Sequence, residues 1–316
     1  MNEFELIKQF FVRHQRDDVV MGIGDDAAVL RAPPGHELVT TVDTLIRGVH
    51  FPEDTSAYDV GYKSLAVNLS DLAAMGAQPA WATLALTLPD NNTDWLEDFS
   101  RGMFELAEQH MVSLVGGDTT RGELSISIQC TGFVPEGQAV MRSGARAGDL
   151  IFVSGTLGDA WLGLQSYSGE ISFSDTDLQS ARLRLNRPTP HITLGQSLVS
   201  FATAMIDISD GMLADLGHIL EASGLAAELD LTRIPLSILA RQYLSQGGEL
   251  MHLLSGGDDF ELCFTLPPEH QLQAQTISKQ CGCPLTCIGT VQPGSGIVGR
   301  SEHETQTLQA SGYQHF

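Results

Sequence analysis

The sequence has 316 residues, of which 42% are hydrophobic, and carries a formal net charge of −22. A chain of this length forms one large domain or two ordinary domains, each with its own core. The negative charge argues against a nucleic-acid partner, because phosphate backbones are bound by clustered Lys and Arg side chains. It does not exclude a phosphate-bearing substrate, provided that metal ions supply the positive charge.

The N-terminus has the features of a folded helix. Residues Met1–Lys8 are acidic and amphipathic; Phe4, Ile7 and Phe11 share a helical face, as do Leu6 and Phe10. A signal peptide instead has a basic stretch followed by an apolar one. No apolar run approaches the roughly 20 residues that cross a bilayer. We therefore expect a first helix packed on the protein, no membrane partner and a cytoplasmic location.

Three of the five cysteines lie close together, at positions 281, 283 and 287. A disulfide framework is not expected in a chain of this size without a secretion signal. The three thiols lack a fourth ligand at a familiar zinc spacing, so core cysteines are preferred here over a structural metal site.

The first half alternates predicted strands and helices, which indicates an α/β or α+β domain. A turn at Gly22–Asp26 separates two short strands. The longer elements are strands at 37–44, 81–88, 111–115 and 124–134 and helices at 58–76 and 94–110. The strand at 111–115 is expected to end where Gly116 and Gly117 begin.

The polar, Gly-rich stretch 137–148 predicts a domain boundary. We place an N-terminal domain at 1–137 and a C-terminal domain at 138–316. In the second domain the pattern predicts strands at 149–155 and up to Phe264, a loop at 168–177, and helices at 158–164, 191–201 and 213–223.

Carboxylates recur beside glycines or hydroxyls where predicted strands end, at Asp25, Asp26, Asp43, Asp118, Asp207 and Asp210. Asp71 lies near the end of an apolar helix. Gathered carboxylates repel one another unless cations bridge them, and hard oxygen ligands favour Mg²⁺. Since the sequence has no Gly-x4-Gly-Lys-Ser/Thr loop, metal ions would have to neutralise the phosphates in a phosphoryl-transfer enzyme. The alternative is a scatter of turn and capping acids.

An ordered series of motifs resembles the thiamine-monophosphate kinases. The series runs from the first helix to the last residues and comprises Gly22–Ala27, Thr41–Thr44, Gly48–Phe51, Asn68–Ala77, Gly116–Thr119, Arg142–Ala145, Asp207–Gly211 and Ser255–Leu262. The resemblance implies a two-domain fold like that of aminoimidazole ribonucleotide synthetase, with an α/β N-terminal domain for metal and nucleotide binding and an α+β C-terminal domain. It also implies a homodimer that pairs through the N-terminal sheet.

The activity implied by the resemblance is phosphorylation of thiamine monophosphate to thiamine diphosphate, with ATP as co-substrate and several Mg²⁺ ions. The resemblance also implies that the transfer is direct and in-line. The attacking phosphate oxygen is already ionised at neutral pH, so no strong base is required. Catalysis then consists of positioning and charge neutralisation.

Site residues are carried over by position. Asp71, Asp207 and Asp210 are the implied catalytic acids. The metal shell comprises Asp26, Thr41, Val42, Asp43, Asp71, Asp118, Asp207 and Asp210, with Val42 offering only its carbonyl. The nucleotide contacts are Gly117, Asp118, Arg142 and Ser209, and the thiamine contacts are His50, Asp258 and Phe316, with Tyr313 as second choice for the aromatic. Relatives commonly have Glu where this chain has Asp258, one methylene shorter.

Rival interpretations exist inside and outside this fold. Aminoimidazole ribonucleotide synthetase is the alternative within the superfamily. A selenophosphate synthetase needs a reactive Cys near the N-terminal glycines, whereas the first cysteine here is Cys130. An acidic Ca²⁺-binding scaffold is disfavoured, because the acids lie far apart, unlike those of a 12-residue EF-hand loop.

Overall fold

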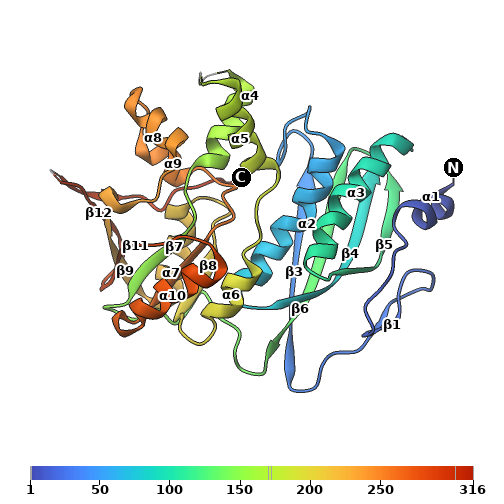
Figure 1. The fold of residues 1–316 in the computed structure, drawn as a ribbon, viewed down its shortest axis with the longest axis horizontal. Coiled ribbons are helices and arrows are strands. Elements are labelled where there is room, and N and C mark those ends of the chain that lie inside the picture. The colour runs from blue at the N-terminus through green and yellow to red at the C-terminus, as the bar shows by residue number, and fades with distance from the viewer. Residues whose placement is uncertain (1, 170, 172, 303, 316) are drawn as a thin grey trace. The chain divides into compact units, whose positions relative to one another are not determined.

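The computed structural model describes the chain except for Met1, Glu170, Ser172, His303 and Phe316. The chain divides into two compact units (Figure 1). Unit 1 comprises the residues up to Leu72 together with Ala77–Gly137, and unit 2 comprises Ala73–Gly76 together with the residues from Gln138 onward. Among the described residues, no helix is both long enough and apolar enough to span a membrane.

Unit 1 is built on a four-stranded sheet with strand order β3-β6-β4-β5. Its neighbours are antiparallel except for the parallel pair β4 and β5. A separate antiparallel pair, β1 and β2, flanks the Gly22–Ala28 turn, in which residues 24–27 are exposed. The elements are α1 Glu3–Phe10, β1 Val19–Met21, β2 Val29–Leu30, β3 His36–Ile46, α2 Ala57–Ala74, β4 Gln78–Leu88, α3 Thr93–Gln109, β5 Ser113–Arg121 and β6 Ser125–Pro135.

Helices α2 and α3 cover one face of this sheet (Figure 1). The alternation of β6 explains the arrangement. Ile126, Ile128 and Cys130 are buried on the helix side, whereas Ser125 and Ser127 are partly exposed and Gln129 is exposed. The helices approach one another closely. A Cβ on Gly61 would lie 2.0 Å from the carbonyl oxygen of Phe99, and one on Gly102 would lie 2.0 Å from that of Tyr58. The core of unit 1 therefore lies between the helix pair and the sheet.

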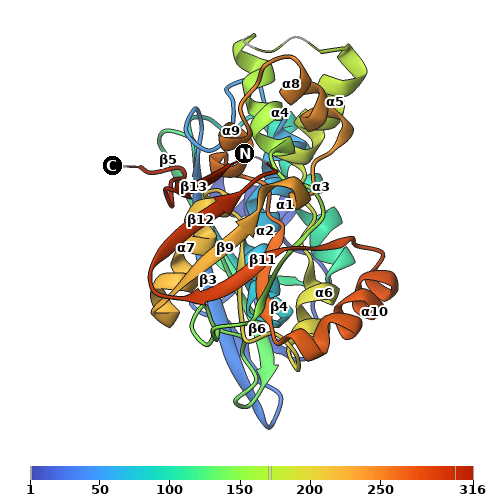
Figure 2. The same cartoon turned by 90° about the vertical axis from the view of Figure 1, so that its left-hand side faces the viewer.

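Unit 2 is built on a seven-stranded sheet with strand order β13-β12-β9-β11-β7-β10-β8. All neighbours are antiparallel except β12 and β9 (Figure 2). Its strands are β7 Leu150–Ser154, β8 Ala204–Asp207, β9 Leu225–Asp230, β10 Leu262–Leu266, β11 Leu285–Pro293, β12 Gly296–Arg300 and β13 Thr305–Leu308. Its helices are α4 Asp159–Ser168, α5 Asp175–Asn186, α6 Ile192–Leu198, α7 Met212–Ser223, α8 Ile238–Ser245, α9 Leu250–Ser255 and α10 Gln271–Cys281, with short 3-10 turns η1 Leu231–Arg233 and η2 Pro268–His270.

The main core of unit 2 forms where α7 packs on the sheet. Met212, Leu216 and Ile219 of the helix are buried in one cluster with strand residues such as Val153 and Ile206. Strands β7 and β10 are buried along nearly their whole length, so they have continuous apolar runs in place of strict alternation.

Most predicted elements are confirmed, but two of the predictions differ from the structure. The structure also has elements without a predicted counterpart, among them β9, β11 and α10. Strand β5 does not end before Gly116 but continues to Arg121, since it pairs in parallel with β4 as far as Leu88. The segment predicted as a loop at 168–177 already contains the start of α5. This helix is capped by Ser174, whose side chain accepts a hydrogen bond from the Asp177 N–H. It buries few apolar side chains, among them Ala181 and Leu185, so its sequence lacks a strong apolar stripe.

Candidate active site

Strand β3 and helix α2 bring Thr41, Asp43 and Asp71 together in unit 1. Residues 41 and 43 are two apart on β3, so their side chains lie on the same face of the sheet. The hydroxyl of Thr41 donates a hydrogen bond to the Asp71 carboxylate. Val42, between them, lies on the other face and is 63% exposed. It can therefore offer only its backbone carbonyl to a ligand on the Asp71 side.

The two carboxylates interact unfavourably when both are ionised. Burial, followed by the charge and hydrogen bonding of Asp71, raises the pKa of Asp43 to about 7. Burial also raises the pKa of the Cys130 thiol, and the charges of both acids add to that effect. The pair is thus a place where a cation would be stabilised, because a positive charge would relieve the repulsion.

Asp118 lies elsewhere on the same sheet. It pairs with Ala85 of β4, and that row continues through Ser127 to Thr44 of β3. This row adjoins the row that contains Asp43, so the side chains of Asp118 and Asp43 lie on opposite faces of the sheet. Three strand spacings, roughly 14 Å, separate Asp118 from Thr44. Gly117, just before it, is required by close packing, because a Cβ there would lie 1.9 Å from the Leu84 carbonyl oxygen.

Asp26 lies in the exposed turn between β1 and β2. Its backbone N–H donates to the carboxylate of Asp25 at 2.8 Å, and Gly24 adopts φ 127°. The turn therefore presents two adjacent acids to solvent, as the Gly-Asp-Asp sequence predicts.

His50 is fixed by the loop that follows β3. Its Nδ1 accepts from the backbone N–H of Ile46 at 3.0 Å, which sets the ring orientation. The carbonyl of His50 accepts from Nζ of Lys63 at 3.2 Å. Lys63 is only 2% exposed, in the apolar face of α2. Lys63 is not among the residues predicted from the sequence, although a charged side chain inside an otherwise apolar helical run was its signal.

In unit 2, the loop 207–211 after β8 is shaped by Asp215. The Asp215 carboxylate accepts from three consecutive backbone N–H groups, those of Ser209, Asp210 and Gly211, at 3.0, 3.0 and 3.1 Å. Burial and the charge of Asp210 raise the pKa of Asp215 to about 7, although the three N–H donors act in the opposite direction. Asp215 is not among the residues predicted from the sequence, although an acid in the first turn of α7 was its signal.

Asp258 lies against this loop. Its backbone N–H donates to the carbonyl of Ser209 at 2.8 Å, and the Phe260 N–H donates to that of Ile208 at 2.8 Å. Asp258 has φ 70°, a left-handed conformation that is rare outside glycine. Gly257 allows the approach, because a Cβ there would lie 2.4 Å from the Ser209 carbonyl oxygen. The Asp207–Asp210 and Asp258 motifs are thus neighbours in space.

The C-terminal segment joins the same neighbourhood. The Tyr313 N–H donates to the Asp210 carbonyl at 3.0 Å, and its ring packs edge-on against His315. Phe316, the first choice for an aromatic contact to thiamine, lies outside the described residues.

Arg142 is exposed in the segment before β7. The N–H of Met205 in β8 donates to the carbonyl of Met141 at 3.0 Å, so the arginine's segment runs along the edge of the strand that ends at Asp207. Asp207 itself is buried.

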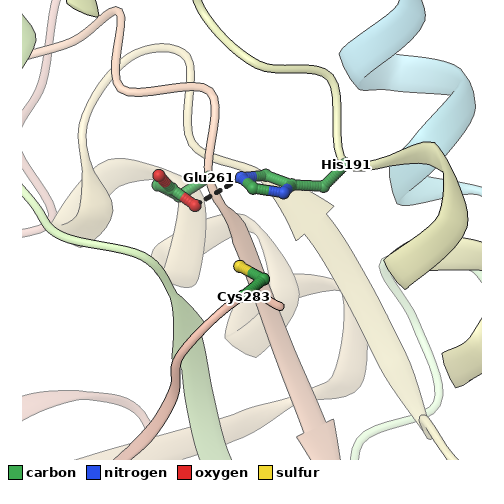
Figure 3. A group of neighbouring side chains, drawn as sticks. All are labelled: His191, Glu261 and Cys283. Carbon is green, nitrogen blue, oxygen red and sulfur yellow. Dashed lines mark ion pairs between the residues drawn. The ribbon is translucent and has the colours of Figure 1, made fainter. Parts of the chain in front are cut away.

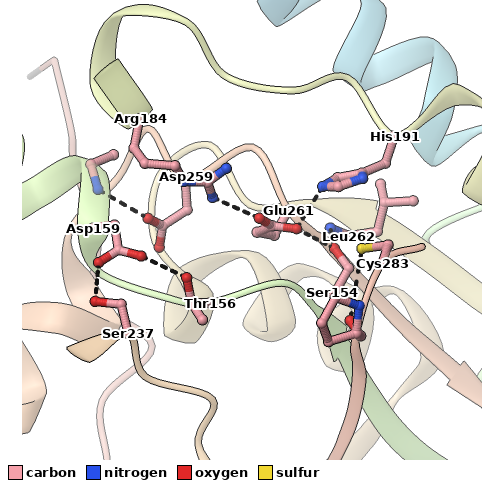
Figure 4. Close-up of polar contacts among 12 residues, drawn as sticks. Ser154, Thr156, Asp159, Arg184, His191, Ser237, Asp259, Glu261, Leu262 and Cys283 are labelled. Carbon is pink, nitrogen blue, oxygen red and sulfur yellow. Dashed lines mark hydrogen bonds and ion pairs between the residues drawn. The ribbon is translucent and has the colours of Figure 1, made fainter. Parts of the chain in front are cut away.

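The segment that carries Asp258 is anchored by a buried ionic network (Figure 4). Glu261 pairs with Arg184 and His191, each at 2.6 Å, and accepts from the Ser154 hydroxyl at 2.5 Å. Burial acts to raise the pKa of Glu261, but His191 and Arg184 outweigh it and lower the pKa to about 2. Asp259 accepts from the Gly158 N–H at 2.8 Å, at the start of α4.

Comparison with known proteins shows which family the chain belongs to. Residues 24–134 match the family model described as AIR synthase related protein, N-terminal domain, and residues 146–301 match the corresponding C-terminal domain. Thiamine-monophosphate kinase of Escherichia coli is 45% identical over 318 residues, which cover 99% of this chain and 98% of the relative. That of Haemophilus influenzae is 43% identical over 324 residues, covering 100% and 98%.

Solved structures of thiamine-monophosphate kinases have the same fold as this chain. The crystal structure of thiamine-monophosphate kinase from Stenotrophomonas maltophilia superposes with a TM-score of 0.85 at 49% identity, covering 92% of each chain. AaThiL complexed with AMPPCP and TMP has a TM-score of 0.80 at 33% identity, covering 93% of this chain and 92% of that one. The fold is therefore the two-domain AIR synthase-like fold, and the chain belongs to the thiamine-monophosphate kinase family.

Proposed function

We propose that this protein transfers the γ-phosphoryl group of ATP to thiamine monophosphate, in line and directly, at a site where aspartates hold Mg²⁺. Family membership supports the reaction, and the relative AaThiL was solved with AMPPCP and TMP. The observation that carries the metal claim is the Asp43–Asp71 pair, in which burial, together with the charge and hydrogen bonding of Asp71, raises the pKa of Asp43 to about 7. Two carboxylates held this close favour a bridging cation.

The residues of unit 1 fit Mg²⁺ by their chemistry. Thr41, Asp43 and Asp71 offer hydroxyl and carboxylate oxygens, which are the hard ligands that Mg²⁺ prefers. We further propose the Val42 carbonyl, Asp26, Asp118, Asp207 and Asp210 as metal ligands, with Asp71, Asp207 and Asp210 as the essential acids. Bound Mg²⁺ would supply neutralisation of the phosphate charges.

The other site residues then act by positioning. The attacking phosphate oxygen is ionised at neutral pH, so no side chain has to remove a proton from it. Arg142 has the guanidinium fork suited to nucleotide phosphate. Ser209, Gly117 and Asp118 are the remaining proposed nucleotide contacts. His50, Asp258 and Phe316 are proposed to bind the thiamine part, so they set which acceptor is used.

The test is release of ADP from Mg-ATP with and without thiamine monophosphate, with the product identified by mass. One thiamine diphosphate formed for each ADP is the expected result. ADP release with formylglycinamidine ribonucleotide instead would move the chain to aminoimidazole ribonucleotide synthetase chemistry. No release with either acceptor would contradict the proposed function.

We also propose a homodimer formed through the sheet of unit 1. Strand β3 is an edge strand of 11 residues, and Leu38, Val42 and Ile46 lie exposed on its outer face. A row of apolar side chains on an exposed sheet is typical of an interface. Leu38→Glu should convert a dimer to a monomer in sedimentation equilibrium, whereas Val29→Glu, at an exposed position of β2, should not. A wild-type protein that sediments as a monomer would contradict the proposal.

A further inference from the structure

A second group of metal-ligating side chains lies at one end of the unit 2 sheet. His191, Glu261 and Cys283 place their ligand atoms within 4.8 Å of one another. His191 directly precedes α6, Glu261 directly precedes β10, and Cys283 lies between α10 and β11. Figure 3 shows the His191 ring facing the Glu261 carboxylate, with the Cys283 sulfur directed toward both. We call these three residues the His–Glu–Cys cluster.

The carboxylate of the cluster is held in one orientation. Oε1 of Glu261 pairs with Nη2 of Arg184 at 2.6 Å, and Oε2 accepts from Ser154 Oγ at 2.5 Å. Ser154 Oγ in turn accepts from the backbone N–H of Leu262 at 2.8 Å. A Cβ on Gly155 would lie 2.2 Å from Oε1, so the backbone packs directly against the carboxylate. Partners that orient a ligating carboxylate are a regular feature of metal sites.

The backbone of Cys283 and Pro284 is held by hydrogen bonds on both sides. The Cys283 N–H donates to the Ser278 carbonyl at 3.2 Å, and the Ser278 hydroxyl donates to the Cys283 carbonyl at 2.8 Å. The Gly155 N–H donates to the Pro284 carbonyl at 2.9 Å. These bonds keep Cys283 beside the strand end that carries Ser154, so the three ligands are brought together by the fold and not by a mobile loop.

We propose that the His–Glu–Cys cluster binds one Zn²⁺ ion, with His191, Glu261 and Cys283 as three ligands and water as the fourth. Imidazole nitrogen, carboxylate oxygen and thiolate sulfur are the zinc ligands of proteins. Usual zinc bond lengths in a tetrahedron separate the ligand atoms by about 3.4–3.6 Å. His191 Nε2 and Glu261 Oε2, now 2.6 Å apart, must therefore part by roughly 1 Å, through rotation of the His191 side chain while Glu261 keeps its partners.

The charge of the cluster suits a divalent cation, and its ligand types favour zinc over Mg²⁺. An imidazolium, a thiol, the Glu261 carboxylate and the Arg184 guanidinium together carry one positive charge. Zinc bound to neutral imidazole and thiolate leaves that total unchanged, because its two charges replace two protons. Mg²⁺ gains nothing from a sulfur ligand and demands six oxygen-type ligands.

Zinc bound here would stiffen the neighbouring site segments. The carbonyl of Glu261 accepts from the Ile208 N–H at 2.8 Å, and Asp258 lies three residues before Glu261. The cluster therefore connects α6, the end of α10 and both loops of unit 2 that carry candidate site residues. We expect zinc to raise the melting temperature of the full chain, as any ligand selective for the folded state does.

The experiment uses Co²⁺ as a spectroscopic substitute for Zn²⁺ on the full-length protein, in excess Mg²⁺ to saturate oxygen-ligand sites. The wild type should develop a thiolate-to-cobalt charge-transfer band that one equivalent of Zn²⁺ abolishes. Cys283→Ser should lose the band and weaken zinc affinity by about tenfold or more. Cys281→Ser is the matched control, since Cys281 is a partly buried thiol two residues away and outside the cluster. This variant should keep both the charge-transfer band and the zinc affinity of the wild type.

A wild type without the band would overturn the proposal, and so would a band that persists in Cys283→Ser. Ser154→Ala gives a further check that spares all three ligands. It should weaken zinc binding while keeping the band, because it removes only the hydroxyl that orients Glu261. Zinc affinity unchanged in both Cys283→Ser and Ser154→Ala would place the ion elsewhere.

Discussion

Asp43 of β3 lies beside Asp71 of α2, and burial, together with the charge and hydrogen bonding of Asp71, raises the pKa of Asp43 to about 7. The two residues come from different elements and are joined through Thr41, which donates a hydrogen bond to Asp71. A like-charged, partly buried pair is costly to the fold. It is retained where a cation or a proton offsets the repulsion, so the pair links stability to both pH and Mg²⁺.

The first prediction concerns pH. The folded-state pKa of Asp43 lies above its unfolded value of 3.8, so the folded state holds the extra proton between these values. Without Mg²⁺, this group's contribution is complete below about pH 4 and is lost as pH rises through 7. The free energy of unfolding of Asp43→Asn should therefore exceed that of the wild type by on the order of 1 kcal/mol at pH 8, and should equal it at pH 4. Thermal melts of both proteins in EDTA at the two pH values measure this gain, and added Mg²⁺ should abolish it. A difference in Tm between variant and wild type that is the same at pH 4 and pH 8 would contradict the prediction.

The second prediction concerns Asp71. Asp71→Asn should lower kcat by on the order of a thousandfold, because a charge-neutralising site loses one carboxylate. The fold should be kept, since the substitution also removes the repulsion on Asp43. Thermal melts and steady-state rates measure the two effects. Glu97→Gln, an exposed acid of α3, is the control. An Asp71→Asn enzyme with a near-normal rate would remove Asp71 from the proposed mechanism.

The third prediction concerns Asp215. Asp215→Ala should leave three backbone N–H groups of the 209–211 loop without their acceptor, which costs about 2–4 kcal/mol. Asp215→Asn keeps one acceptor oxygen, so its free energy of unfolding should fall by less than that of Asp215→Ala. Urea unfolding measures the difference, with Glu221→Ala on the exposed side of α7 as control. Equal losses for Ala and Asn would mean that packing, and not the acceptor, is what Asp215 provides.

The fourth prediction separates two roles of His50. His50→Ala should raise KM for thiamine monophosphate about tenfold and leave KM for ATP nearly unchanged. His50→Asn keeps an acceptor for the Ile46 N–H and so preserves the loop. The Asn variant should still have the raised KM, because the rest of the ring is gone. Recovery of normal KM in the Asn variant would show that His50 only shapes the loop.

Local pattern predicted the elements whose periodicity is strong. The alternation of β6 and the apolar run of α2 are confirmed with nearly the expected bounds. Helix α5 was missed, because few of its side chains are buried. The extension of β5 through Gly116 and Gly117 depends on its pairing with β4, which a local pattern does not contain.

The site was predictable only in part for the same reason. Acids beside glycines could be found along the chain, but the closeness of Asp43 and Asp71 arises from the packing of α2 on β3. The roles of Lys63 and Asp215 are defined by backbone groups that they reach in the folded chain. The His–Glu–Cys cluster unites residues 191, 261 and 283, whose spacing matches no familiar zinc motif.

The proposed direct transfer is tested most directly by the stereochemistry at phosphorus. ATP made chiral at the γ-phosphorus with oxygen isotopes is reacted with thiamine monophosphate, and the configuration of the transferred group is determined. A single in-line displacement between bound substrates predicts inversion. Retention of configuration would require a phosphorylated side chain as intermediate, and would contradict an account in which aspartates hold metal and position substrates.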